Sequence, residues 1–275
     1  MAEPALSACA DIARRFDPDL FQAALFAPEP ARERLMVLTA FDVELSRAVQ
    51  RAPGRDEGPL IAAMRLQFWR DRLADARAGG PAVAHEVAEP LHALVAGPLA
   101  ERAGEAEALV EARARELETP FDAAAWEAWA EARFGSWHRL VLACLGLADD
   151  TAASAAGRLA AAGFTLRHAA AMARQGACLI PDLADGDRSA LARGEETGGT
   201  AAAVRGLVER GRGARRDLSV RRPALGRRAA PAFLALRRAE RDLDRLAGGH
   251  GLVEAPEPPP GRALAYAWRA ASGRW

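Results

Sequence analysis

Three acidic residues after Pro181 are close enough together to suggest metal chemistry. Asp182, Asp185 and Asp187 could offer carboxylate oxygens, the ligands that Mg²⁺ and Ca²⁺ prefer in proteins. The same run is also typical of a polar turn ahead of a helix that begins near Ser189, because short polar side chains favour turns by bonding to nearby backbone. We favour the turn, so this segment is not a predicted metal site.

The histidines and cysteines offer no second set of metal ligands or nucleophiles. No two histidines have the i, i+4 spacing of a helical metal pair, and His168 lies in an otherwise apolar stretch, as a core histidine does. The sequence has no G-x-S-x-G, no P-loop and no G-x-G-x-x-G after a strand. The cysteines are odd in number and far apart, which predicts free thiols in a reducing compartment. These residues are His85, His92, His138, His168, His250, Cys9, Cys144 and Cys178.

Composition narrows the class of protein further. The 275 residues are half hydrophobic, enough for one large core, and the formal net charge is zero. A neutral chain is not expected to bind nucleic acid along its length. No apolar run approaches the roughly 18 residues of a membrane-spanning helix, and the N-terminal segment, with Glu3 and Asp11, does not resemble a secretory signal. We expect a cytoplasmic protein, at most peripheral to a membrane.

The elements that must position any site are predicted to be helices. Ala, Leu, Arg and Glu dominate and period-two alternation is absent, so the fold class is all-α. Asp17 and Asp122 are candidate N-caps, and Trp126 and Trp129 share one helix face. We expect one domain over 1–246, then a Gly/Pro-rich linker and short terminal helix over 247–275. The predicted helices are 5–16, 18–26, 30–51, 59–77, 83–98, 103–118, 122–146, 151–175, 200–218, 228–246 and 261–271.

Seven segments, taken in order, resemble the squalene/phytoene synthase family. The most specific is MRLQFWRDRL, Met64 to Leu73, which is similar to the "IRLQWWRDAL" signature of one subgroup. The similarity covers about 20 to 246 and implies an isoprenoid-synthase-type helical bundle around a central cavity. The other segments are Asp19 to Leu35, Leu38 to Arg47, Glu111 to Phe121, Phe134 to Gly146, Gly163 to Pro181 and Phe233 to Leu246.

The resemblance also points to what this chain lacks. Working members carry a D-D-x-x-D run and an N-x-x-x-D-x-x-x-D run, whose carboxylates hold Mg²⁺ against the diphosphate substrate. None of the matching positions is a carboxylate here, and the family's later Tyr is Leu179. We expect neither catalytic residues nor a cofactor, with Mg²⁺ only if an atypical synthase is correct. The matching positions are Ser46, Arg47 and Gln50 for the first run and Phe164, His168 and Met172 for the second.

A polar set that matches subgroup motifs should remain in the family's cavity. Its members could form buried ion pairs that fix helix register, or its arginines could hold an anion such as phosphate. We favour the ion pairs, because Arg113 and Glu116 are three apart and pair readily on a helix. The set is Glu44, Arg47, Gln67, Arg70, Arg113, Glu116 and Arg167.

Members with the RLQWWRD signature and no Asp-rich motifs look like assembly factors of respiratory complex I. That resemblance implies a protein that acts by binding a protein partner. Two alternatives remain open: a prenyl-diphosphate condensing enzyme with atypical metal ligands, and a protein that binds a prenyl lipid without turning it over.

The segment 205–228 is strongly basic in a chain that is neutral overall. It contains nine arginines and two acids, a local excess of seven positive charges. Such a cluster could hold anionic lipid head groups or an acidic partner, although a merely solvated helix face is an equal alternative. Nucleic acid is not expected, because the stretch has no aromatic residue for base stacking. The residues proposed for contact are Arg215, Arg216, Arg221 and Arg222.

Overall fold

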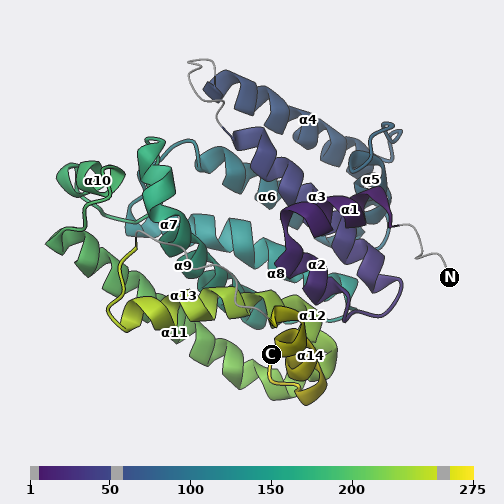
Figure 1. The fold of residues 1–275 in the computed structure, drawn as a ribbon. Helices are drawn as coiled ribbons and strands as arrows, with labels where there is room; N and C mark the ends of the chain where they lie inside the picture. Colours follow the sequence, from purple (N-terminus) through teal and green to yellow (C-terminus); the bar gives the residue numbers. More distant parts are fainter. Residues whose placement is uncertain (1–5, 51–57, 253–260) are drawn as a thin grey trace.

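The computed structural model describes residues 6–50, 58–252 and 261–275, and within them every regular element is helical, as predicted. The helices pack into one bundle, with the N-terminal helices on one side and α11, α13 and α14 on the other (Figure 1). The α-helices are α1 Ala8–Phe16, α2 Pro18–Ala24, α3 Ala31–Val49, α4 Gly58–Ala78, α5 Ala88–Ala96, α6 Ala103–Arg115, α7 Ala123–Ala130, α8 Ser136–Cys144, α9 Asp150–Arg174, α10 Asp185–Ala192, α11 Gly198–Leu225, α12 Ala230–Phe233, α13 Arg237–Ala247 and α14 Arg262–Ser272.

Local sequence signals explain where several helices begin. The side chain of Asp17 accepts a hydrogen bond from the N–H of Leu20 at 3.0 Å, and that of Asp122 from Ala125 at 2.7 Å. Each bond satisfies a backbone donor that has no partner within the helix. Both predicted N-caps are therefore confirmed.

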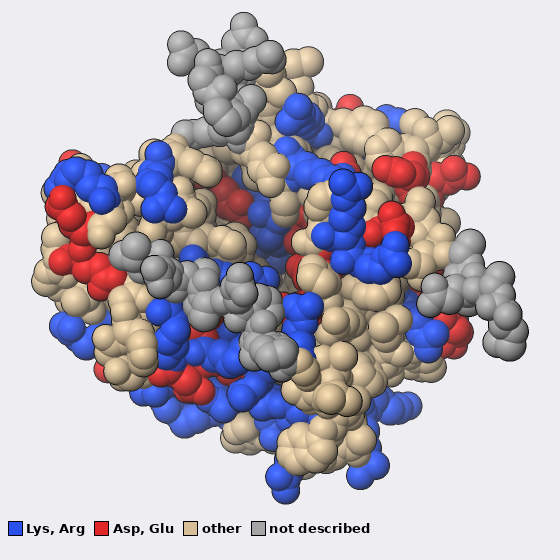
Figure 2. All heavy atoms as spheres, in the orientation of Figure 1, with Lys and Arg blue, Asp and Glu red and all other residues tan. Residues whose placement is uncertain are grey.

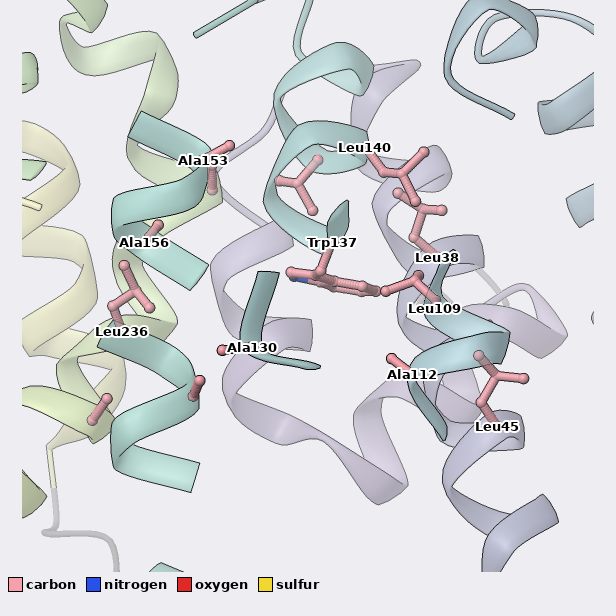
Figure 3. Close-up of a cluster of buried hydrophobic side chains, with 14 of the residues drawn as sticks. Leu38, Leu45, Leu109, Ala112, Ala130, Trp137, Leu140, Ala153, Ala156 and Leu236 are labelled. Carbon is pink, nitrogen blue, oxygen red and sulfur yellow. The ribbon is translucent and has the colours of Figure 1, made fainter. Parts of the chain in front are cut away.

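Helix α9 runs through the middle of the bundle and packs against α8, α10, α11 and α13. Its small residues permit close packing: a β-carbon on Gly157 would lie 2.5 Å from the backbone nitrogen of Gly135. Gly135 ends a π-helical turn, Glu131–Gly135, that joins α7 to α8. Figure 3 shows the adjoining core, with Trp137 lying between the leucines of neighbouring helices and the alanines of the bundle centre.

Several predicted boundaries differ from the structure. α10 begins at Asp185, four residues before the expected start, and α5 begins at Ala88 and not near 83. The stretch 228–246 is broken into the end of a 3₁₀ turn (Arg227–Ala229), α12, a second 3₁₀ turn (Leu234–Leu236) and α13. Pro231 lacks a backbone N–H and is suited to a first helical turn, which explains why α12 starts there.

The outer helix α4 buries the face that contains the RLQFWRD motif. Leu66, Trp69 and Leu73 are 1%, 3% and 1% exposed. The Trp69 ring packs edge-on against Phe41 and Phe68, with ring centres 5.2 and 5.1 Å away. The motif that is most specific in sequence therefore serves packing at this position.

The C-terminal helix α14 folds back onto the start of the chain. The Tyr266 hydroxyl donates a hydrogen bond to Asp19 at 3.0 Å, and Trp275 stacks on Phe233 with ring centres 4.5 Å apart. Both aromatic side chains are almost fully buried. Residues 261–275 thus pack on the same bundle as the rest of the chain.

Candidate functional site

A cavity of about 640 Å³ lies between α2, α3, the π-helical turn, α9 and α13. One wall is apolar and includes Phe134, Trp137, Phe164 and Met172. The lining also contains charged residues from α3, α6 and the π-helical turn, and the Arg133 guanidinium lies over the Phe134 and Phe164 rings, 4.8 and 5.9 Å from their centres. Figure 2 shows this face of the molecule hollowed near its centre, with basic and acidic side chains inside the hollow.

Four charged side chains form a closed network at the base of this cavity. Arg133 donates to Asp42 at 2.7 Å and to Glu116 at 3.2 Å. Arg113 donates to the same two carboxylates, at 3.3 and 3.1 Å. Trp129 adds a hydrogen bond from its indole N–H to Glu116 at 3.3 Å. Two cations and two anions therefore neutralise one another, away from bulk water.

Burial makes this network sensitive to the loss of any member. Burial alone would raise the pKa of Asp42, but the guanidinium groups of Arg133 and Arg113 outweigh it and hold the pKa below its ordinary range. Arg113 and Arg133 are 4% and 5% exposed as side chains. A buried charge without its counter-charge is strongly unfavourable, so each carboxylate is needed to keep the arginines in place.

Five of the six positions that match the family's metal motifs line this cavity. Ser46 and Gln50 enter from α3, and Phe164, His168 and Met172 from α9. The Ser46 hydroxyl donates to the backbone carbonyl of Asp42 at 2.9 Å and also contacts the Arg113 guanidinium.

This set of side chains does not fit Mg²⁺, which needs several oxygen ligands in octahedral geometry. It offers one hydroxyl and one amide among a phenyl ring, an imidazole and a thioether. Burial lowers the pKa of His168, whose ring packs on Phe164 at 4.5 Å. Within the part of the chain that the structure describes, no three His, Cys, Asp or Glu side chains converge as a metal site would require. Asp182 lies in the turn that precedes α10. Asp185 and Asp187 lie in the first turn of that helix.

The predicted cavity set divides into two groups. Arg113, Glu116 and Arg167 line the cavity, and Arg167 pairs with Asp242 of α13 and donates to the Arg238 carbonyl at 3.2 Å. Gln67 and Arg70 were placed wrongly in the cavity. They lie on the outer side of α4, where Gln67 donates to Asp71 at 2.7 Å and Arg70 to Glu111 at 2.6 Å.

Glu44 and Arg47 were also placed wrongly in the cavity. They pair with each other beside an outer groove between α3 and α4, and the Arg47 guanidinium lies 4.0 Å from the centre of the Phe16 ring. Glu44 is two residues and Arg47 five residues after Asp42 on α3, and these spacings turn their side chains away from the cavity wall.

Arg133 and Asp42 belong to the charge network but not to the cavity set predicted from the sequence. Arg133 is the less predictable of the two. It lies in the π-helical turn, and a π-turn in a helix frequently marks a functional position. The segment that resembles the family begins at the next residue, Phe134, so the sequence comparison stopped one position short of Arg133. Nothing in the local pattern indicates that Arg133 faces inward, because its burial depends on the packing of Gly135 against Gly157.

The basic segment is less free than its composition suggests. Arg221 donates to Asp149 at 2.7 Å, Arg215 pairs with Glu240 and Asp244, and the Arg222 guanidinium lies over Trp275. Of the four residues proposed for contact, Arg216 alone has no such partner among the described residues. Charges of α13 and of the start of α9 therefore neutralise part of the predicted excess.

The family description "Squalene/phytoene synthase" matches residues 13–265. Solved structures of similar fold include a squalene synthase, HpnC, from Alicyclobacillus acidocaldarius, with a TM-score of 0.71 and 17% identity over 88% of this chain and 92% of that one. A dehydrosqualene synthase in complex with a ligand gives a TM-score of 0.75 and 13% identity over 96% of this chain and 94% of that one. At these identities the likeness establishes the fold.

A curated relative matches over a shorter stretch. It is the Drosophila melanogaster homologue of NADH dehydrogenase (ubiquinone) complex I assembly factor 6, 35% identical over 65 residues. The match covers 24% of this chain and 19% of that protein. In the described residues, no helix has the length and apolar character needed to cross a bilayer.

Proposed function

The chain belongs to the squalene/phytoene synthase family, and from that premise we propose that it is a non-catalytic member that acts by binding, as an assembly factor for a respiratory complex of the complex I type. The location that suits this role is the inner face of the energy-transducing membrane, with peripheral attachment. Its expected partner is a protein subunit of that complex.

One observation supports the loss of catalysis most directly. Two helices, α3 and α9, face the cavity with five of the positions where the family places metal ligands, and none of these residues is a carboxylate. The nearest acid, Asp42, already accepts hydrogen bonds from two buried arginines. A diphosphate leaving group needs a cation that can bridge its oxygens. Arg113 and Arg133 are cations committed to carboxylates, so they are poor substitutes.

Two similarities support the assembly role. One is to the curated relative, and the other is between the RLQFWRD motif of α4 and the signature of the assembly-factor subgroup. The 65 matching residues give the link to complex I assembly. A cavity kept rigid by a buried charge network and a large packed bundle would suit a protein that presents a fixed surface to a partner.

Enzyme assays test the first half of the proposal. The purified chain would be incubated with farnesyl or geranylgeranyl diphosphate and Mg²⁺, with a working squalene synthase as the positive control. We expect no metal-dependent pyrophosphate release and no condensed prenyl product. Formation of such a product would overturn the non-catalytic assignment.

Genetics tests the second half. Deleting the gene in its own organism should lower the amount of assembled complex I on native gels, and expression of the chain should restore it. A Gln50→Ala variant should restore assembly as well as the unaltered chain does, because the metal position has no catalytic duty in this proposal. Normal complex I levels in the deletion strain would contradict the assembly role.

A second candidate is binding of a prenyl lipid without turnover, which the apolar cavity wall favours. Phe134, Phe164, Met172 and Leu236 could pack along an isoprenoid chain. Native mass spectrometry with farnesol would detect a one-to-one complex. Ala171→Phe, which narrows the cavity, should weaken it, whereas Ala63→Phe on the outer face of α4 should not.

A further inference from the structure

Helix α14 exposes two large apolar side chains on one face. Leu264 and Trp268 are 77% and 58% exposed. They are four residues apart and so lie on the same helix face, away from Tyr266, which is buried against α2. An exposed apolar pair also occurs on α4, at Leu60 and Met64, so the pair on α14 is informative only together with the residues around it.

The end of α11 lies beside α14 and also exposes side chains (Figure 1). Arg216 and Val220 are also four residues apart and exposed, and Val220 is 76% exposed. Arg227, in the turn that follows α11, lies against the end of α14: a β-carbon on Gly273 would be 3.2 Å from its side chain. Trp275 ties the two segments together by donating to the Gly226 carbonyl at 3.1 Å. The name α11–α14 surface is used here for the exposed basic and apolar residues of these two joined segments: Arg216, Val220, Arg227, Arg228, Leu264, Trp268 and Arg274.

Within the part of the chain that the structure describes, the basic residues of the α11–α14 surface lack a counter-charge. Arg216, Arg227, Arg228 and Arg274 form no ion pair with any described residue, unlike Arg215 and Arg221 of the same segment. The Arg274 guanidinium lies 5.6 Å from the Trp268 ring, so charge and aromatic group are adjacent. The sequence has no acidic residue in 218–239 or in 261–275. Figure 2 shows basic and uncharged side chains along the lowest part of the molecule, where Figure 1 places α14.

This combination has the chemistry of a bilayer interface. Trp is favoured at the level of the lipid head groups, where its ring is partly apolar and its N–H stays hydrated. Arginines beside it attract anionic head groups, whereas a nearby acid would be repelled. A helix lying flat with Leu and Trp below and arginines alongside is the arrangement of interfacial amphipathic helices.

We propose that the α11–α14 surface binds anionic phospholipid head groups and lays α14 on the membrane. The inference deepens the proposed function by naming the surface of peripheral attachment, and it rests on that function only for the choice of membrane. It also revises the earlier set of basic residues, because Arg215 and Arg221 are occupied by Glu240, Asp244 and Asp149.

Vesicle flotation of the full chain tests the proposal. Vesicles of phosphatidylcholine alone and of phosphatidylcholine mixed with phosphatidylglycerol would be compared at low and high salt. We expect binding only to the anionic vesicles and its loss at high salt, because exposed charges are screened. Arg227→Gln/Arg228→Gln should reduce binding about tenfold or more. Leu264→Ser/Trp268→Ser should reduce it by a similar factor.

Two matched controls remove the same groups elsewhere. Leu60→Ser/Met64→Ser takes away another exposed i, i+4 apolar pair, 67% and 66% exposed, on α4. Arg65→Gln/Arg115→Gln takes away two exposed arginines of α4 and α6 that, like the test residues, form no ion pair with a described residue. Neither control should alter flotation. Circular dichroism melting of all four variants would show that each remains folded, which is expected because every substituted side chain is largely exposed.

Three results would overturn the proposal: no flotation, flotation independent of lipid charge, or equal losses in the test and control variants. If the α14 variants float normally but fail to restore complex I in the deletion strain, the surface binds protein and not lipid. Conversely, anionic flotation that depends on α14, in a protein whose deletion leaves complex I intact, would keep this inference and remove the proposed function.

Discussion

At the scale of single residues, the cavity is distinguished by four buried, mutually paired charges. Asp42 accepts hydrogen bonds from Arg113 and Arg133, and Glu116 accepts from the same pair. The guanidinium groups lie beside Ser46, one of the metal-motif positions. A neutral network of two arginines and two carboxylates thus lies beside one of the positions where the family's catalytic motif has a carboxylate.

Asp42→Asn should show how much the fold depends on this network. The change leaves two buried arginines with one carboxylate, and we expect a loss of about 3 kcal/mol in the free energy of unfolding. Glu111→Gln is the matched control, because it removes the acid of the exposed Arg70–Glu111 pair and should cost less than about 1 kcal/mol. Urea denaturation measures both. Equal small losses would mean that the network does not stabilise the fold.

Asp17 should make stability depend on pH. Burial, with the nearby Asp42 and Asp19, raises the pKa of Asp17 to about 6. The unfolded value is about 3.9, so the group stabilises the folded state at low pH and this contribution is lost as the pH rises through about 6. Asp17→Asn keeps the cap without the charge. It should therefore stabilise the protein more at about pH 7.5 than at about pH 4.5, by about 1 to 2 kcal/mol.

The exposed cap Asp122 supplies the control for that experiment. Asp122→Asn also keeps an N-cap, but the side chain is exposed and lies outside the cavity. It therefore measures what the same exchange does to unfolding at an exposed cap. A parallel response of the two variants would show that the pH dependence does not come from the buried position.

At the scale of elements, close contacts of α9 place the cavity wall. Gly157 lies against Gly135 at the end of the π-helical turn, and Gly163 lies against Ala239 of α13. These contacts set the distance between α9 and the elements that contain Arg133 and Arg238. A helix with larger residues at these points could not approach both neighbours.

Gly157→Ala should therefore be destabilising although alanine favours helices. Its β-carbon would lie 2.5 Å from a backbone nitrogen that cannot move independently, and we expect a loss of about 1 to 3 kcal/mol or more. Gly206→Ala, in open space on α11, should instead stabilise by about 0.5 to 1 kcal/mol. Thermal melting separates the two. A gain for both would show that α9 can shift without cost.

Sequence patterns predicted the local features of these elements correctly, but they did not predict which other elements each side chain contacts. The helical class and the caps Asp17 and Asp122 follow from residue types and short-range bonding, so they were predictable. The inward direction of Arg133 and the outward direction of Gln67 and Arg70 were not. Those directions depend on how α4 and the π-helical turn pack against other helices, and that information is not local to any segment.

At the scale of the whole molecule, the two ends of the described chain meet. Asp19 of α2 accepts the Tyr266 hydroxyl at 3.0 Å and pairs with Arg262 at 3.0 Å, both from α14. Trp275 stacks on Phe233 of α12. The helix that presents the α11–α14 surface is thereby fixed to the wall of the cavity, since Asp19 and Leu20 both line it.

Tyr266→Ala should loosen elements that are far apart in sequence. Removing a fully buried ring and the hydrogen bond to Asp19 is expected to cost about 3 to 5 kcal/mol locally. Hydrogen exchange read by mass spectrometry should then show lost protection in α14 and also in α2, while α4 stays protected because it does not depend on this contact. Leu264→Ala, on the exposed face of the same helix, should leave the hydrogen-exchange protection of both α14 and α2 unchanged. Faster exchange confined to α14 would mean that α2 is held by α1 and α3 alone, and that the C-terminal helix can leave the bundle without opening the cavity wall.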